Sequence, residues 1–348
     1  MSSTGNGMKA AIAGVFVQTN EPDANRVVAF RRDADGTLVS LGSYPTGGVG
    51  NGIPHLTSQG SVVLSGNGRT LLVTNAGSND VSAFGIIADG LELIQTIASG
   101  GASPKSLAEH EGTVYVLNTG EPSLTGFRLG EQGLVEIAGS RRLLAADADP
   151  AQVGFAPNGR SLVVTQRGTN SIAVFTVDDA GLLGDRSEVP SSGPTPYGFA
   201  FTADGTLIVT EAFGAQTGTA AASSYAIAGA SVEPVSRSVG NGRSEICWAV
   251  VSADDRYVFT TNFADGAVSR YAIGADGGIQ LDDAVAGTAV DGMTGLRDED
   301  LSADGRFLNA IDADARRIFG WAVRGQGALE PVGSWPGLPS TVAGLAAS

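Results

Sequence analysis

Several features that commonly define a protein class are missing from this sequence. Cys247 is the only cysteine, so an internal disulfide framework is excluded. No hydrophobic run approaches the length of a membrane span, and no apolar stripe of ten or more residues follows the 3.6-residue helical period. A nucleophile elbow, a Walker loop, zinc-ligand spacing and a Rossmann fingerprint are also lacking. Helical, membrane-spanning and disulfide-stapled classes are therefore poor descriptions of this chain.

Positive charge is scarce too. The 21 Lys and Arg residues face 36 Asp and Glu residues, which leaves a net charge of −15, and the basic residues form no patch. Because such a chain repels phosphate groups, nucleic acids and anionic membranes are poor partners. Residues 1–20 contain one lysine and a short apolar run that continues into a strand-like segment, which makes a poor signal peptide. We therefore expect a soluble, cytoplasmic protein.

What the sequence has in abundance is glycine. Fifty glycines and 42% hydrophobic residues are typical of many short strands joined by tight turns. One stretch shows the pattern clearly, with apolar runs at 62–65, 70–74, 81–87 and 91–97 separated by turns or loops at 66–69, 76–79 and 88–90. Asn-Gly and Asp-Gly in such turns are strong signals for β-hairpins. The sequence therefore predicts an all-β protein built from four-stranded units.

This unit recurs along the chain. The second strand of each copy ends at a polar residue, and these residues are Asn20, Asn75, Asn118, Gln166, Glu211, Asn262 and Asp312, spaced 43 to 55 residues apart. Seven four-stranded copies at this period predict one seven-bladed β-propeller domain over residues 1–348. The expected blades span 60–101, 104–147, 150–194, 197–240, 246–290 and 296–337, with a first blade made of 15–55 and 339–347.

The first copy lacks an innermost strand, because too little sequence precedes Val15. Residues 338–346 resemble the innermost strands expected at 150–156 and 196–200. We therefore expect the C-terminal strand to complete the first blade and close the ring, which leaves no unpaired edge at the seam.

The strand order places residues that begin an inner strand or end a second strand near one mouth of the central tunnel. They include the aligned positions from Asn75 onward and also His55, Gln59, Lys105, Gln152, Arg167, Tyr197, Arg243, Glu245, Cys247, Trp248, Arg297, Asp298, Glu299 and Asp300. Glu211 is the leading catalytic candidate, because equivalent positions carry amides and a carboxylate in a narrow tunnel can act as a general base. The alternative is a carboxylate that accepts backbone N–H bonds from the following loop.

Other side chains complete the predicted site. His55 is a second catalytic candidate, since a neutral imidazole can activate water or protonate a leaving oxygen, although a loop histidine can also have no role. Arg243, the third catalytic candidate, and Arg167 can orient a substrate carboxylate or stabilise an oxyanion, and bridging between loops is the alternative. The remaining predicted substrate-binding residues are Gln166, Tyr197, Glu245, Trp248, Asn75, Asn118 and Asn262. For the three asparagines, tying loops to blades is the first interpretation.

Five short motifs carry a family resemblance. They are Tyr44-Pro45-Thr46-Gly47-Gly48, Ser58-Gln59-Gly60-Ser61, LVTNAGSN at 72–79, PYGFAF at 196–201 and Cys247-Trp248. With the repeats, they make the chain resemble, essentially from end to end, the bacterial seven-bladed propellers of the lactonase family, which include 6-phosphogluconolactonase-like and 3-carboxy-cis,cis-muconate lactonizing proteins. The resemblance implies a site in the central tunnel, without cofactor or metal, that opens or forms the lactone ring of a small polar substrate, carboxylated or sugar-derived.

Two other functions stay open at this point. Gln166-Arg167 departs from the family pattern, in which an acidic residue precedes a basic one. This departure and the small-residue loop at 212–223 favour a non-catalytic propeller that binds a small molecule or a protein on its loop face. An isomerase or cyclase of a biosynthetic intermediate is the other alternative. The sequence leaves the oligomeric state open.

Overall fold

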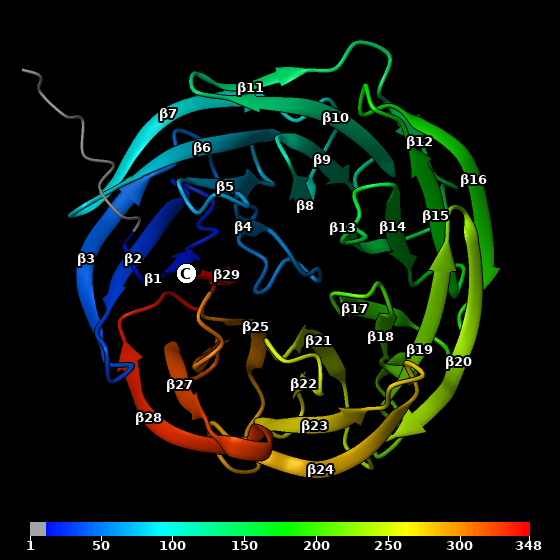
Figure 1. The fold of residues 1–348 in the computed structure, drawn as a ribbon. Helices are drawn as coiled ribbons and strands as arrows, with labels where there is room; N and C mark the ends of the chain where they lie inside the picture. Colours follow the sequence, from blue (N-terminus) through cyan, green and yellow to red (C-terminus); the bar gives the residue numbers. More distant parts are fainter. Residues whose placement is uncertain (1–11) are drawn as a thin grey trace, which may run out of the picture.

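The computed structural model describes residues 12–348. Within this range the strands form seven antiparallel sheets, which stand as blades around a central axis (Figure 1). In each sheet the strands follow one another from the axis to the rim, and only the sheet that joins both ends of the described chain breaks the sequential order. The prediction of an all-β, seven-bladed propeller is confirmed.

Each blade contributes strands to four concentric rings. The innermost strands are β29 (Ala343–Ala347), β4 (Val62–Leu64), β8 (Pro104–His110), β13 (Pro150–Phe155), β17 (Pro196–Phe201), β21 (Ile246–Val251) and β25 (Leu296–Leu301). The second strands are β1 (Gly14–Gln18), β5 (Thr70–Asn75), β9 (Thr113–Asn118), β14 (Ser161–Gln166), β18 (Leu207–Glu211), β22 (Tyr257–Asn262) and β26 (Phe307–Asp312).

The two outer rings complete the blades. The third strands are β2 (Arg26–Arg32), β6 (Asp80–Ile87), β10 (Ser123–Gly130), β15 (Ser171–Val177), β19 (Ala221–Ala228), β23 (Ala267–Ile273) and β27 (Arg317–Val323). The outermost strands are β3 (Leu38–Pro45), β7 (Gly90–Ala98), β11 (Gly133–Glu136) with the short β12 (Arg142–Leu143), β16 (Leu183–Pro190), β20 (Ser231–Gly240), β24 (Ile279–Thr288) and β28 (Leu329–Pro336).

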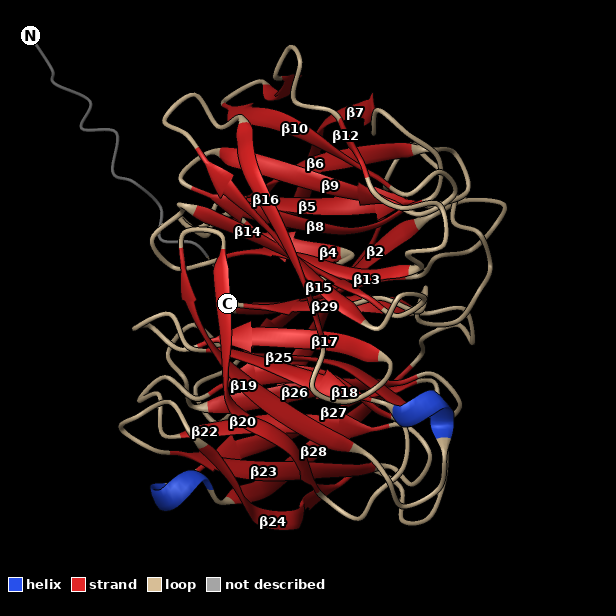
Figure 2. Ribbon diagram, turned by 90° about the vertical axis from the view of Figure 1, so that its right-hand side faces the viewer, coloured by secondary structure: helices blue, strands red, loops and turns tan. Residues whose placement is uncertain are grey.

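Two short 3-10 turns lie on opposite faces of the ring, where Figure 2 shows them in blue. The first, η1 (Phe213–Ala215), follows the second strand of the fifth blade. The second, η2 (Gly325–Gly327), connects the two outer strands of the seventh blade. We call the face with η1 the upper face; the loops after the second strands and the links into the innermost strands lie there. No helix in the described part of the chain is long and apolar enough to cross a membrane.

The ring closes through the last strand of the chain. β29 pairs antiparallel with β1, so that Val15 lies opposite Ala347 and Val17 opposite Leu345. This pairing gives the first blade its innermost strand, as the sequence predicts. The terminal strand therefore belongs to the sheet that the chain begins.

The turns between innermost and second strands share one local pattern. In the second blade, Oδ1 of Asn67 accepts a hydrogen bond from the Arg69 amide at 3.0 Å. Asp254 and Asp304 take the same role in the sixth and seventh blades. Gly68 has a φ of 66°, a left-handed conformation that suits glycine because it has no Cβ. These turns therefore form from residues that lie next to one another in sequence.

Hydrophobic side chains fill the space between neighbouring blades. Phe16 of β1 packs with Val73 and Phe84 of the second blade, all three essentially buried. Val163 of β14 packs in the same way with Val209 of β18. The central strands are buried on both faces, which explains their continuous apolar runs.

The innermost strands also expose a backbone edge toward the axis, and side chains from other blades bond to it. Gln152 of β13 pairs its side-chain amide with the backbone of β17, at 2.6 and 3.1 Å. At the seam, Oδ2 of Asp298 accepts the Gly344 amide at 2.9 Å, and Oδ2 of Asp300 accepts the Ala347 amide at 2.8 Å. Two carboxylates of the seventh blade thus hold the terminal strand of the first.

Deletion of residues 338–348 tests the closure of the ring. The shortened chain loses the β1–β29 pairing and leaves two buried carboxylates of β25 without their amide donors, so we expect loss of the cooperative thermal transition seen for the full chain. Circular dichroism melting measures this, and a synthetic peptide of residues 338–348 added in trans should restore part of the stability. An unchanged melting temperature would contradict the role of this strand.

Candidate functional site

Four aromatic or imidazole rings meet at the upper end of the tunnel. The ring of His55, in the link that precedes β4, lies edge-on to Trp248 of β21, with 5.3 Å between centroids. It also stacks on Phe263, in the loop after β22, at 6.4 Å. Tyr197 of β17 also lies edge-on to Trp248, with 5.7 Å between centroids. We call these four residues the aromatic arc.

Cationic side chains flank both ends of the aromatic arc. The guanidinium of Arg297 lies over Phe263 at 4.6 Å, and that of Arg167 lies over Tyr197 at 5.1 Å. Lys105, at the start of β8, lies near Arg167, and burial together with this charge lowers the pKa of Lys105. Although the net charge of the protein is negative, Arg297, Arg167 and Lys105 therefore lie close together at the aromatic arc.

Arg297 is the least satisfied of these cations. Its side chain is 6% exposed, and its nearest carboxylate oxygen, on Asp314, lies 3.9 Å away. Among residues 12–348, neither Nε nor Nη1 of this arginine has a hydrogen-bond partner. A buried guanidinium with free donors is costly unless a ligand supplies acceptors. By contrast, Arg167 forms an ion pair with Asp149 at 2.7 Å.

His55 is held neutral by its surroundings. Burial lowers its pKa well below the ordinary value, and the charges of Arg297, Arg167 and Lys105 lower it further. Its Nδ1 is buried and has no hydrogen-bond partner within the described residues. An uncharged imidazole beside three cations can accept a proton once an anion offsets those cations.

An unusual backbone holds His55 above the tunnel. His55, Leu56 and Thr57 have φ values of 50°, 53° and 54°, so three successive non-glycine residues are left-handed. Leu56 is fully buried against Ala76 and Ala343. Such strain persists only where the surroundings enforce it, and it is common at functional sites.

Gln59 fixes the other end of the same link. Its amide nitrogen donates to the Ala249 carbonyl at 3.0 Å, and its oxygen accepts the Ala249 amide at 3.3 Å. Ser58 donates to the Lys105 carbonyl at 2.6 Å. The link between the first and second blades therefore reaches across the axis to the sixth blade.

Glu211 lies in a different setting from the one predicted for it. It is fully buried, and Oε1 accepts hydrogen bonds from the Gly193 amide at 2.8 Å and Ser223 Oγ at 2.6 Å. Ser191 also donates to Oε1, and Ser238 donates to Oε2. The carboxylate thus ties the link before β17 to its own blade; its role is structural, as in the alternative interpretation, but the donors come from the preceding link and from serine hydroxyls and not from the following loop.

The amide residues at equivalent positions bond to their own blade and to the link that precedes it; Thr46 donates to Asn75 Oδ1 at 2.8 Å and Asn241 to Asn262 Oδ1 at 2.9 Å. Asn75 donates to Ser82 at 2.8 Å, Asn118 to the Ser99 carbonyl at 3.3 Å, and Asn262 to Ser269 at 2.9 Å. All three are fully buried. They therefore tie links to blades and do not form a ring of free donors around the tunnel.

Gln166 follows this pattern with a carboxylate as partner. It donates to Glu188 of β16 at 2.9 Å and to Ser171 at 2.8 Å. The acidic group absent from position 166 is thus supplied by the outermost strand of the same blade. This departure from the family pattern concerns the interior of the blade and not the aromatic arc.

The last two predicted residues lie beside the arc. Arg243 forms an ion pair with Asp265 at 2.9 Å, in the loop that also carries Phe263. Glu245 directly precedes β21, and burial raises its pKa while Arg297 opposes that change. Of the predicted residues, the structure thus brings together His55, Tyr197, Trp248 and Arg167, with Arg243 and Glu245 at the margin.

Phe263 is absent from the predicted site residues, although it directly follows the aligned position Asn262. Arg297 and Lys105 are predicted to lie near the mouth but without a role. The sequence feature that could have assigned Arg297 and Lys105 to the site is their position at the start of innermost strands, where the blades converge. Across residues 12–348, no three His, Cys, Asp or Glu side chains form a group that could hold a metal ion.

The chain belongs to the lactonase family of seven-bladed β-propellers. The family model described as "Lactonase, 7-bladed beta-propeller" matches residues 134–216 and 209–338. A search of curated proteins gave no match.

Solved structures with the same fold come from several bacteria. A Pseudomonas aeruginosa periplasmic gluconolactonase is 17% identical, over 97% of this chain and 99% of its own, with a TM-score of 0.74. A Bacteroides fragilis protein provisionally named a 6-phosphogluconolactonase is 18% identical over 99% of both chains, with a TM-score of 0.71. A Desulfotomaculum acetoxidans protein of unknown function is 15% identical over 97% of this chain and 99% of its own, with a TM-score of 0.74. At these identities the likeness establishes the fold.

The buried acids of β25 predict how stability depends on pH. Burial raises the pKa of Asp298 and of Asp300 to about 7, well above their value in an unfolded chain. Between pH 4 and 7 the folded state therefore binds more protons than the unfolded state, so the free energy of unfolding falls as pH rises through this range. Thermal melts should give a higher melting temperature at pH 5 than at pH 8.

Asp298→Asn and Asp300→Asn should each flatten this dependence, because asparagine keeps an acceptor oxygen but does not titrate. Asp23→Asn, at an exposed position, is the matched control and should leave the slope unchanged. Equal slopes for wild type and both β25 variants would exclude these acids as its source.

Proposed function

We propose that this protein hydrolyses the lactone ring of a small substrate that carries a carboxylate or phosphate group, at the aromatic arc. The observation that carries the proposal is the buried guanidinium of Arg297, with free donors, next to the neutral imidazole of His55. Membership of the lactonase family supports the reaction class. The gluconolactonase of similar fold supports a sugar-derived lactone as one form of the substrate.

The cations select the substrate. Arg297, Arg167 and Lys105 converge on one end of a chain whose net charge is −15. Guanidinium groups form strong charge-assisted hydrogen bonds with carboxylate and phosphate, and Nε and Nη1 of Arg297 are free donors within the described residues. The buried rings of Trp248 and Tyr197 lie beside these cations and lower the polarity of their surroundings. An anionic lactone therefore fits this site better than a neutral one.

His55 is the base in the proposed reaction. The bound anion offsets the neighbouring cations, which raises the pKa of His55 and lets it take a proton from water. The water oxygen then bonds to the lactone carbonyl carbon, and a guanidinium stabilises the oxyanion that forms. When the tetrahedral intermediate collapses, the ring C–O bond breaks and the imidazolium returns its proton to the leaving oxygen. The product is the open hydroxy acid.

Glu211 and Arg243 have supporting roles in this proposal. Glu211 accepts four hydrogen bonds from the fifth blade and the link before it, and Arg243 is neutralised by Asp265. Neither group is free to take a proton from water at the arc. We assign Glu211 to the stability of the link that leads into Tyr197.

Proton release at fixed pH measures the proposed hydrolysis, with gluconolactone, 6-phosphogluconolactone and a carboxymuconolactone as substrates. His55→Gln should lower kcat by about two to four orders of magnitude, because it removes general-base catalysis. Arg297→Gln should raise KM for the anionic lactones far more than for gluconolactone. Arg306→Gln, on the lower face, is the control and should behave as wild type.

Full turnover by His55→Gln would overturn the assignment of the base. If anionic lactones bind with dependence on Arg297 but none is hydrolysed, the non-catalytic binding propeller replaces the enzyme. The two readouts, binding and turnover, therefore separate the alternatives.

Glu211→Gln separates a structural carboxylate from a catalytic one. The amide presents an NH2 group to hydroxyl and amide donors, so we expect a loss of about 1–3 kcal/mol in the free energy of unfolding. kcat should stay within a few-fold of wild type, because the arc is unaltered. Urea unfolding and the lactone assay measure the two quantities, with the exposed Glu136→Gln as control. A hundredfold loss of kcat at unchanged stability would return Glu211 to the catalytic group.

A further inference from the structure

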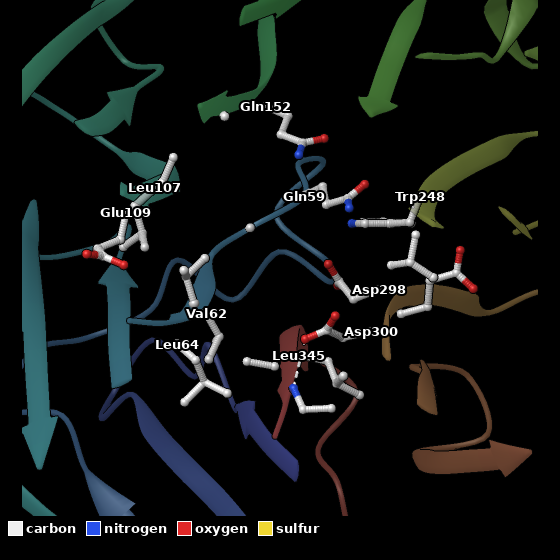
Figure 3. Close-up of a pocket in the computed structure, with 18 of the residues that line it drawn as sticks. Gln59, Val62, Leu64, Leu107, Glu109, Gln152, Trp248, Asp298, Asp300 and Leu345 are labelled. Atoms are coloured by element: carbon white, nitrogen blue, oxygen red, sulfur yellow. Dashed lines mark hydrogen bonds between the residues drawn. The ribbon is translucent and has the colours of Figure 1, made fainter. Parts of the chain in front are cut away.

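A cavity of about 330 Å³ lies in the tunnel between the innermost strands, and Trp248 is the one member of the aromatic arc that lines it. Its walls come from the innermost strands, and it extends from Gln59 and Trp248 toward Leu64 and Glu109, which lie near the lower ends of β4 and β8 (Figure 3). Both of these lower residues and Asp300 keep partial exposure to solvent. The volume is that of a small-molecule site.

The two sides of this cavity differ in chemistry. Figure 3 shows Val62, Leu64 and Leu107 on one side, where Glu109 also lies, and Leu345 next to Asp300. Asp298 and Asp300 project from β25 on the other side (Figure 3). Within the described chain, no lysine, arginine or histidine lines the cavity. The acids that line it therefore have no cation inside the cavity, and the nearby charge that stabilises Asp298 is that of its neighbour Arg297.

The polar end contains a donor as well as an acceptor. Trp248 is fully buried, and its Nε1 has no hydrogen-bond partner within residues 12–348. Figure 3 shows this nitrogen directed into the cavity, on the same side as Asp298. Asp298 is 2% exposed and uses Oδ2 to hold the Gly344 amide. The indole N–H lies close enough to Asp298 to lower the pKa of that carboxyl but makes no hydrogen bond of normal geometry with it, so a ligand with both a donor and an acceptor can bridge the two groups.

We propose that the cavity is a second ligand site, which binds a small aliphatic amine that carries a hydroxyl or ether oxygen next to its ammonium group. The ammonium group donates to Asp298, with Asp300 adding negative charge, and the oxygen accepts the Trp248 N–H. The aliphatic chain lies along Val62, Leu64 and Leu345. This site is separate from the proposed lactonase site, because none of the three cations there, Arg297, Arg167 and Lys105, lines the cavity.

The charges of the cavity and the arc support this separation. The raised pKa of Asp298 shows that its negative charge is poorly stabilised in the empty cavity, and an ammonium group would remove that cost. The arc, in contrast, lacks acceptors for Arg297. The two sites thus select ligands of opposite charge.

Isothermal titration calorimetry tests the proposal with three probes of similar length: 2-amino-1-hexanol, hexylamine and 1-hexanol. We expect 2-amino-1-hexanol to bind most tightly and 1-hexanol at least about tenfold more weakly, since it lacks the charged hydrogen bond. Asp298→Asn should weaken 2-amino-1-hexanol by about tenfold or more. Asp312→Asn, which removes a buried acid of the same blade outside the cavity, should not change the affinity.

Trp248→Phe is a second variant, and it keeps both carboxylates that bond β25 to β29. It should reduce the affinity for 2-amino-1-hexanol to that for hexylamine and leave hexylamine binding unchanged, because only the hydroxyl contact is lost. Three outcomes would each overturn the proposal. They are equal affinity for 1-hexanol and the amines, unchanged affinity in Asp298→Asn, and no binding of 2-amino-1-hexanol to the wild type at millimolar concentration. None of these readouts depends on lactone hydrolysis.

Discussion

The fold depends on how the innermost strands satisfy the backbone edge that faces the axis. A sheet edge buried at the centre of a ring has neither another strand nor bulk water to bond with, so side chains must supply donors and acceptors. Gln152 does this for β17, Gln59 for β21, and Asp298 and Asp300 for β29. The blades are thus joined by polar contacts at the axis and by apolar contacts farther out.

This requirement also explains the two chemically distinct ends of the tunnel. Where the innermost strands run side by side, side chains such as Gln152, Asp298 and Asp300 bond to the backbone edges. Above Trp248 the strands give way to links and loops, and Arg297 and His55 keep free nitrogen atoms. The groups that could serve a reaction therefore lie where the pairing of the blades ends. The left-handed turn at His55–Thr57 lies at the same level.

The seven blades and the closing strand could be predicted because their signals are local. Asn67, Gly68 and Arg69 make a turn whose hydrogen bonds involve only neighbouring residues, and similar residues recur in other blades. The candidate site was only partly predictable. Position along a strand puts Glu211 at the correct end of β18 but does not say that its carboxylate turns toward Ser223 and Gly193.

The aromatic arc could be recognised only in the three-dimensional structure. The sequence could predict His55, Tyr197 and Trp248 as site residues from their positions at the starts of innermost strands. Nothing in the sequence, however, indicates that Arg297 contacts Phe263. The two residues belong to different blades and are about 34 positions apart in the sequence. The direction of each side chain depends on how its strand twists toward the axis. Similarly, Glu188 replaces the acid absent from position 166 through a strand pairing that no single motif encodes.

The pairing of Val15 with Ala347 has a kinetic consequence. Within each blade the contacts join strands that are close in sequence, so they can form early and quickly. Only the closure of the ring brings together segments more than three hundred residues apart, and the entropy of forming so large a loop must be overcome before those contacts contribute. The blades therefore fold first and the circle closes last. In the native protein, the same junction between β1 and β29 is where a transient opening of the ring begins.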